Sequence, residues 1–323
     1  MKLTAAQSKS IQCLRGLAIT AVIFIHNTPS GLTTVFCRPF LNFAVGLFLF
    51  LSGMLSNSSN WKPGKRIVKV LIPYVLWTLI YSAMHYIRTP AMIPTVFLRN
   101  VLTGGAAAVM YYIFVYCEFT LLIPLIDRLA KSRFKYYGFF ITPIEIIFMR
   151  SLPLILGIEM NQYISIVMNI SCLGWFTYFY LGYLLGNNLI SIDTSSKKIP
   201  FLWVISILFE FAEGWFYYTR GYGNYGTQLK ITSVISGVLF ALMAYNYVLH
   251  GTPKNIKVLE VLGDNSFGIY FSHLAVMTVI GWIPVYTKYV TYPMTAVITI
   301  IVTTGFVLLG KKVLGKHSGY LAL

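Results

Sequence analysis

The feature that most constrains this chain is a series of apolar stretches, each about 20 residues long, that continues from one end to the other. An α-helix needs about 20 apolar residues to cross the hydrocarbon core of a bilayer. Short connections separate ten such segments, whose bounds are about 10–28, 39–56, 67–87, 107–126, 136–156, 165–187, 199–219, 229–250, 267–284 and 293–314. The sequence therefore predicts an all-α, polytopic membrane protein with about ten transmembrane helices in one bundle.

Charge is too scarce here for a soluble protein. Charged residues make up 11% of the 323 residues and hydrophobic residues 57%, whereas a soluble domain is about 25% charged. Because a chain this poor in charge lacks a surface that water can solvate, lipid must solvate it instead. We find no internal repeat, low-complexity tract or appended soluble domain in the sequence. We therefore expect residues 1–323 to form a single transmembrane domain.

The positions of Lys and Arg indicate how the chain is oriented. With the N-terminus placed in the cytoplasm, 18 of the 25 basic residues, Lys2, Lys131 and Lys254 among them, fall at inner ends of the segments. The seven that fall at outer ends are Arg38, Arg88, Arg99, Arg150, Arg220, Lys230 and Lys288. This bias is the positive-inside pattern of membrane proteins. It predicts cytoplasmic termini, an even number of spans and a multi-pass protein of the cell (cytoplasmic) membrane.

The net charge of +16 does not indicate a nucleic-acid partner. A nucleic-acid-binding protein gathers its Lys and Arg on one face or tail, whereas here they punctuate apolar runs, as expected beside anionic lipid headgroups. The sequence has no Gly-rich phosphate loop, GxSxG or HExxH motif. Nor do its four cysteines have metal-ligand spacing; they are Cys13, Cys37, Cys117 and Cys172. We expect membrane lipids as partners, and neither nucleic acid nor a metal.

The first apolar segment carries two ionisable residues on one face. Such groups cost about 2.5–3.5 kcal/mol each inside a span, so those present are candidates for function. Arg15 and His26 are eleven residues apart, which in an α-helix is three turns plus about 20° and roughly 16 Å along the axis. A lone His on an apolar face is usually a core residue with a satisfied ring, but the Arg in register with it favours a functional pair.

A second candidate site lies where the third segment begins. Arg66 and Lys69 are three residues apart, which places them on one helical face at the expected cytoplasmic mouth. Two cations there suit phosphate groups, such as the diphosphate of a nucleotide-bearing cofactor. The alternative is that both residues only anchor the helix at the membrane surface.

Other polar residues inside spans have several readings. Glu118 follows a run of tyrosines and could contact substrate or pair with a buried Arg or Lys. Glu210 and Glu213 share a face, and could bind a sugar hydroxyl, act as a base, or pair with Arg15 or Arg66. Late in the chain, His273 and Tyr270 share a face with Ser266, and we include both as candidate substrate or supporting residues.

These motifs together resemble membrane acyltransferase family 3, whose members O-acylate bacterial surface and secreted carbohydrates. The blocks that carry the resemblance are Arg15-x10-His26, the block 45–53, Arg66-x-x-Lys69 with Ile72-Pro73-Tyr74 after it, the aromatic block 111–124 and the block 266–273. One position departs from the family pattern, because Lys69 stands where many members have Arg. Lys keeps the charge but loses the two-pronged contact that Arg makes with phosphate.

The resemblance implies about ten helices, an acyl-CoA donor bound from the cytoplasm, and acceptor hydroxyls reached from the outer side. Under this interpretation His26 is the catalytic base or a transient acyl carrier. Arg15 then stabilises negative charge or positions the donor, while Arg66 and Lys69 hold donor phosphates. The expected reaction moves an acyl group, first of all acetyl, from acyl-CoA to a hydroxyl of a cell-surface or lipid-linked glycan.

Two other functions remain open from the sequence. A glycan transporter or flippase could use the same polar residues to line its path. A polysaccharide polymerase would be expected to carry a large outer loop, and none is visible. The basic inner mouth favours a cytoplasmic ligand that carries phosphate over a neutral exported sugar.

Overall fold

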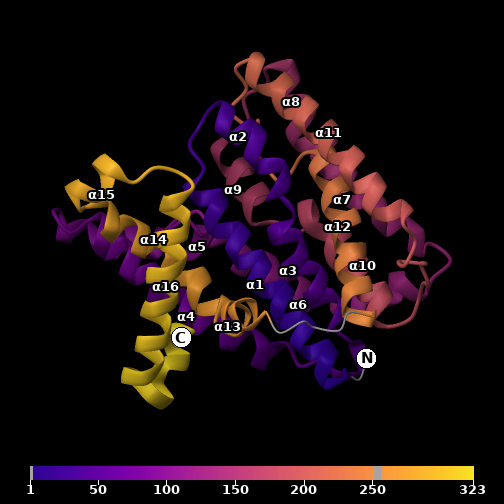
Figure 1. The fold of residues 1–323 in the computed structure, drawn as a ribbon, viewed down its shortest axis with the longest axis horizontal. Coiled ribbons are helices and arrows are strands. Elements are labelled where there is room, and N and C mark those ends of the chain that lie inside the picture. The colour runs from indigo at the N-terminus through magenta and orange to yellow at the C-terminus, as the bar shows by residue number, and fades with distance from the viewer. Residues whose placement is uncertain (1–2, 251–255) are drawn as a thin grey trace. The chain divides into compact units, whose positions relative to one another are not determined.

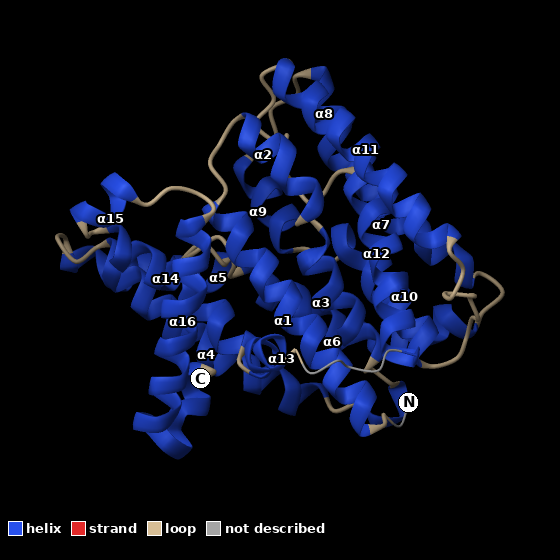
Figure 2. Cartoon of the chain, in the orientation of Figure 1, coloured by secondary structure: helices blue, strands red, loops and turns tan. Residues whose placement is uncertain are grey.

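The computed structural model describes residues 3–250 and 256–323, and every regular element in those ranges is helical (Figures 1 and 2). This confirms the all-α prediction. The described chain falls into two compact units. The first comprises residues 1–61, 123–160 and 173–264, and the second comprises 62–122, 161–172 and 265–323. The division leaves the single-domain expectation as a prediction.

The first unit contains most of the helices. Its elements are α1 (Ala5–Asn27), α2 (Leu32–Cys37), η1 (Arg38–Phe40), α3 (Phe43–Met54), η2 (Ser58–Asn60), η4 (Lys135–Phe140), α7 (Ile141–Ile146), the π-helical turn η5 (Ile147–Ser151), α8 (Leu152–Leu156), η6 (Leu173–Trp175), α10 (Phe176–Gly186), α11 (Lys198–Thr219), α12 (Ile231–His250) and α13 (Lys257–Asp264). Helix α6 (Tyr111–Lys131) contributes its C-terminal part to this unit and its N-terminal part to the second.

The second unit is built around three long helices. Its elements are α4 (Pro63–His85), η3 (Pro90–Met92), α5 (Ile93–Thr103), α9 (Gln162–Ile170), α14 (Ser266–Gly281), α15 (Pro284–Tyr289), α16 (Met294–Leu314) and η7 (Gly315–Leu321). Helix α14 packs against both α4 and α16. The Tyr81 hydroxyl of α4 donates to the Phe271 carbonyl of α14 at 2.7 Å, so a polar contact fixes α4 against α14.

Seven helical stretches in the described chain are long and apolar enough to cross a membrane. They are Ala5–Asn27, Leu32–Met54, Pro63–His85, Lys135–Leu156, Lys198–Thr219, Ile231–His250 and Met294–Leu321. An eighth results if α9 and the η6–α10 helix after it are counted as one broken span. The chain is thus a multi-pass membrane protein, while the count of ten and the cytoplasmic termini stay predictions. Two of the basic residues used for the orientation, Lys2 and Lys254, lie outside the described residues.

Large apolar side chains on the helix surfaces support this membrane assignment. Leu208 and Phe209 of α11 are each 62% exposed, and Ile301 and Leu309 of α16 are 65% and 61% exposed. A soluble monomer does not leave long apolar helix faces open to water. Lipid is therefore the solvent of these faces.

Glycine allows the helices of the first unit to approach at backbone distance. A Cβ at Gly182 of α10 would overlap the Phe50 carbonyl oxygen of α3, and one at Gly186 would overlap that of Met54. Since the hydrophobic effect does not drive helices together inside lipid, such close packing is a main source of their association.

At the end of α6, Asp127 accepts hydrogen bonds from Tyr183 of α10 and from Lys131, each at 2.7 Å.

Candidate functional site

Helix α1 presents Arg15 and His26 as the sequence predicts. The helix begins with a capping box between Thr4 and Gln7 and runs without a break to Asn27. The eleven-residue spacing therefore keeps its helical register, and both side chains lie on one face. Each is half-buried, whereas most other positions on this helix are buried.

Contacts with α13 fix the rotation of α1 next to Arg15. A Cβ at Gly16 would overlap the Leu259 carbonyl oxygen of α13, and one at Gly263 of α13 would overlap the Gln12 carbonyl oxygen of α1. With backbone against backbone on one side, α1 cannot turn about its axis without a clash. The face that carries Arg15 is therefore held in place by α13, which packs beside it at Gln12 and Gly16.

The candidate phosphate site lies at the start of α4, in the second unit. Arg66 is half-buried and Lys69 exposed, and the first turn of the helix contains no acidic residue. Pro63 occupies the first helical turn, where a missing N–H is harmless. The partial positive charge of a helix N-terminus adds to the two cations, so this end of α4 suits an anion.

Glu118 makes a local structural contact within the second unit. Its Oε2 accepts a hydrogen bond from the Cys172 backbone N–H at 2.6 Å. Cys172 follows the C-terminus of α9, so the carboxylate holds the chain where this helix has ended. The sequence suggested substrate or a buried cation as its partner, and the structure gives it a backbone amide.

Glu210 lies at the centre of a buried polar cluster in the first unit. Its side chain has no exposed surface, and both carboxylate oxygens accept hydrogen bonds. Asn42 Nδ2 and Ser233 Oγ donate to Oε1 at 2.5 and 2.6 Å, and Ser236 Oγ donates to Oε2 at 2.6 Å. Arg38 Nε in turn donates to Asn42 Oδ1 at 3.2 Å. The cluster thereby joins α11 to α12 and to the start of α3.

Glu213 and Lys230 extend this cluster. Glu213 accepts hydrogen bonds from the backbone N–H and the hydroxyl of Thr232, the first of them at 3.2 Å. Lys230, which precedes α12, is 1% exposed and donates to the Tyr225 carbonyl at 2.8 Å. Burial lowers the pKa of Lys230, and the nearby carboxylates of Glu210 and Glu213 oppose that shift. The two acidic residues thus have partners in their own unit, among them a lysine that the sequence assigned only to the outer end of a segment.

The same region holds the chain that follows His26. Tyr225, whose carbonyl accepts from Lys230, also accepts a hydrogen bond on its hydroxyl from the Gly31 backbone N–H at 2.9 Å. Thr34 Oγ1 donates to the Pro29 carbonyl at 2.7 Å. The segment between α1 and α2 is therefore tied to the connection between α11 and α12. Through this segment the polar cluster can position the end of α1 that carries His26.

Tyr270 and His273 make contacts inside the second unit. The Tyr270 hydroxyl donates to the Val109 carbonyl. His273 is fully buried, and its Nδ1 lies 3.0 Å from the Ile269 carbonyl one turn earlier, so we assign the ring proton to Nδ1. These contacts position α14, and they involve backbone carbonyls of the protein itself.

Sequence reasoning missed several polar partners. Arg38 and Lys230 were assigned only by membrane side, and Asn42, Ser233 and Ser236 were not singled out. A signal for these partners was present in the sequence. Two successive segments each carry a pair of polar residues spaced three apart, Glu210 with Glu213 and Ser233 with Ser236, so each pair lies on one helical face.

A further ionic contact that the sequence did not reveal joins Glu145 to Arg150. The Arg150 guanidinium lies 3.0 Å from Glu145 Oε1 across a π-helical turn.

The described residues contain no group of three or more His, Cys, Asp or Glu side chains placed to bind a metal.

A family model described as an acyltransferase domain, of the acyltransferase 3 type, matches residues 8–311. Two curated relatives, from Staphylococcus aureus strains MSSA476 and MRSA252, are each described as a probable poly-beta-1,6-N-acetyl-D-glucosamine export protein. Each is 22% identical to this chain over 276 residues, which cover 79% of this chain and 75% of the relative. No solved structure matches.

Proposed function

Because the chain belongs to membrane acyltransferase family 3, we propose that it moves an acyl group from acyl-CoA to a hydroxyl of a cell-surface or lipid-linked glycan. Acetyl is the first acyl group to test, and the cytoplasmic membrane is the proposed location. The observation that carries the proposal is the face of α1, on which an imidazole and a guanidinium are held in register by an unbroken helix.

His26 is the group proposed to act on the acceptor. An imidazole is half-protonated close to neutral pH, so it can take a proton without large tuning. The acceptor hydroxyl gives its proton to His26 while its oxygen attacks the thioester carbonyl. The C–S bond then breaks, and the CoA sulfur leaves with a proton. If His26 is instead the acyl carrier, the ring nitrogen attacks the thioester first, the C–S bond breaks and CoA leaves as its thiol. In a second step the acceptor hydroxyl attacks the acyl-imidazole, the C–N bond breaks, and the hydroxyl proton returns the ring to neutral imidazole.

Arg15 fits a donor-positioning role better than contact with the reacting carbonyl. It lies roughly 16 Å from His26 along the helix axis, which is too far for both side chains to reach one carbonyl. A donor with an anionic end and an extended arm can contact both residues. Arg66 and Lys69 at the start of α4 are proposed to bind its phosphates, where the helix N-terminus strengthens attraction for anions.

The acceptor proposal draws on the two curated relatives. Their description names a polymer of β-1,6-linked N-acetylglucosamine, so an amino-sugar polysaccharide is the first acceptor class to test. The same description names export, which makes glycan export the second candidate function. A transporter with this chain's polar residues along its path would move polymer without needing a proton acceptor at His26.

The experiment compares acyl transfer with export in one set of variants. Purified protein in proteoliposomes receives labelled acetyl-CoA and N-acetylglucosamine oligomers, and mass spectrometry measures ester formation. His26→Gln should reduce the rate by about 10²–10⁴, because an amide cannot take a proton near pH 7. Arg15→Lys should retain part of the activity if charge alone positions the donor. Acylated His26 recovered from a rapid quench would identify the carrier mechanism.

Export is measured in cells that carry the same variants. Surface polymer should persist in the His26→Gln strain but lack acyl groups. A stable His26→Gln protein that acylates at the wild-type rate would remove His26 from the mechanism. Export would be favoured by two results together. The purified wild-type protein would transfer no acyl group, and a variant strain would lose its surface polymer.

A further inference from the structure

The chain that follows His26 is stiff. Helix α1 ends at Asn27, and Thr28 closes it with an extended backbone while donating from its Oγ1 to the Phe24 carbonyl at 2.7 Å. Pro29 comes next, and its ring fixes its own φ and restricts the backbone of the residue before it. A constraint placed on the chain just beyond Pro29 is therefore transmitted to the last turn of α1, which carries His26.

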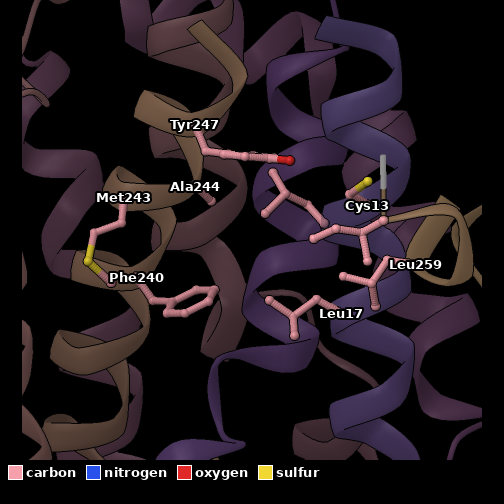
Figure 3. A pocket seen from close by; sticks show the side chains of 9 residues that line it. Cys13, Leu17, Phe240, Met243, Ala244, Tyr247 and Leu259 are labelled. Carbon is pink, nitrogen blue, oxygen red and sulfur yellow. The ribbon is translucent and has the colours of Figure 1, made fainter. Parts of the chain in front are cut away.

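The first half of α1 is fixed by contacts that lie well before His26. The backbone contact with α13 is at Gly16, and ten residues separate Gly16 from His26, or roughly 15 Å along the helix. On the side of α12, an apolar pocket of about 280 Å³ separates the two helices, and Cys13 and Leu17 line it from α1 (Figure 3). The position of His26 thus depends on contacts farther along the chain.

Gly31 supplies such a contact. It precedes α2 with φ +84°, a conformation that glycine adopts freely but does not enforce. Its N–H donates to the Tyr225 hydroxyl at 2.9 Å. Beside this bond, a Cβ at Gly226 would overlap Thr34 Cγ2, so the start of α2 lies directly on the same part of the chain. The Tyr225 hydroxyl therefore selects one conformation for a residue that could adopt several.

Tyr225 is itself held from several sides. Its carbonyl accepts from Nζ of the buried Lys230 at 2.8 Å. Its ring meets that of Tyr218 edge to face, with 5.4 Å between the centroids. A Cβ at Gly214 of α11 would lie 3.2 Å from the Tyr225 carbonyl oxygen, so the backbone rests against this helix. The hydroxyl that binds Gly31 thus projects from a fixed point of the first unit.

We propose that Tyr225 is a positioning residue for acyl transfer: through the Gly31 N–H and the stiff connection after α1, its hydroxyl fixes the place of the His26 ring. This inference rests on the proposed function, because it takes His26 as the group that acts on the acceptor. Tyr225 acts through Gly31 and not on the reacting atoms. It should therefore influence turnover, whereas donor affinity depends on the cations proposed to bind the phosphates.

Hydrogen–deuterium exchange of the full chain in nanodiscs tests the contact without any assay of activity. Tyr225→Phe keeps the ring beside Tyr218 and removes only the acceptor of the Gly31 N–H. Exchange in a peptide that covers residues 28–34 should rise about 2–10-fold, the equivalent of one hydrogen bond. Exchange at residues 5–20 should not change. Tyr222→Phe is the matched control, since it removes a hydroxyl from the same connection at a ring that contacts Tyr217 instead.

Kinetics with labelled acetyl-CoA test the consequence for turnover. Tyr225→Phe should lower kcat about 10–100-fold, because a displacement of about 1 Å at a catalytic group has effects of this size. KM for acetyl-CoA should not change. A double-mutant cycle separates positioning from general damage: in the His26→Gln protein, Tyr225→Phe should cause no further loss, since the ring that it positions is already gone.

Each result supports or overturns the proposal. Wild-type exchange at residues 28–34 in Tyr225→Phe overturns the contact, and raised exchange with wild-type kcat overturns the positioning role. Equal losses of kcat in the His26→Gln and wild-type backgrounds would show that Tyr225 does not act through His26. Equal effects of Tyr222→Phe would remove the distinction between the two hydroxyls. A wild-type protein that transfers no acyl group overturns the proposed function and the catalytic role of Tyr225 with it, whereas the exchange result still decides whether Tyr225 holds Gly31.

Discussion

Replacement of Glu210 by Ala should destabilise the first unit by about 3–5 kcal/mol, the loss usual when one partner of a buried charged cluster is removed. The carboxylate accepts three hydrogen bonds, and each buried donor left unpaired costs about 1–3 kcal/mol. Part of this loss is recovered. Ser236 Oγ also reaches the Ser233 carbonyl at 3.1 Å, while Ser233 Oγ and Asn42 Nδ2 reach the Thr227 carbonyl at 3.3 and 3.4 Å.

Thermal unfolding in detergent, followed with a thiol-reactive fluorophore, measures this loss in each unit. Cys13 in the first unit and Cys172 in the second are both buried, so each reacts only when its surroundings open. Single-cysteine proteins that keep one or the other serve as reporters. Glu210→Ala should lower the temperature of Cys13 labelling by at least about 6 °C, at 2–4 °C for each kcal/mol. The effect at Cys172 should be smaller.

Two further variants complete the test. Glu210→Gln preserves the side-chain shape and should fall between Glu210→Ala and wild type. Glu159→Ala removes an exposed carboxylate and should have no effect. If the Glu210→Ala protein unfolds at the wild-type temperature, the cluster does not hold the first unit together. A stable Glu210→Ala protein that no longer transfers acyl groups would instead place this carboxylate in the chemistry.

Three other predictions concern topology, donor and pH. Reporter fusions should place Lys131 in the cytoplasm and Tyr222 outside, and the reverse result would overturn the orientation together with the donor side. Binding of acetyl-CoA to solubilised protein should weaken with salt and should suffer more from Arg66→Ala than from Lys62→Ala; equal effects would indicate a diffuse basic surface. Burial works to raise the pKa of Asp127, but hydrogen bonds from Lys131 and a tyrosine outweigh it and lower that pKa. Its stabilising effect is therefore complete above the ordinary aspartate pKa of about 3.9 and is lost as the pH falls through the lower folded-state value. Asp127→Asn should lower stability by about 1 kcal/mol at pH 7, and in denaturation curves that difference should shrink below about pH 4.

The helical class could be predicted because apolar length alone dictates it. Breaks within the apolar stretches could not be predicted in this way. The segment predicted at 165–187 is interrupted between α9 and η6, where Glu118 accepts the Cys172 backbone N–H. The segment at 136–156 contains a π-helical turn that brings Arg150 within reach of Glu145. In a regular α-helix two residues five apart point about 140° away from each other, so the sequence spacing indicated no contact.

The candidate site shows the same limit. The register of Arg15 and His26 follows from one continuous helix, so the sequence suffices for it. The partners of Glu210 come from α12 and from the start of α3. Which helix faces contact each other depends on how the helices pack, and the sequence of one segment does not determine that. Lys230 illustrates the consequence. In the sequence it is one of seven basic residues at outer ends of the predicted segments, while in the fold it is a buried donor beside two carboxylates.

The backbone contact between α1 and α13 has a mechanical consequence. Gly16 and Gly263 each leave no space for a side chain, so the backbones of α1 and α13 are in direct contact. We therefore expect the two helices to move as one rigid body. Any displacement of Arg15 during donor binding would then be transmitted to α13. Val258 on α13 is 69% exposed and offers an attachment point for a fluorophore. A probe there would register movements of the first helix without a label on the helix itself.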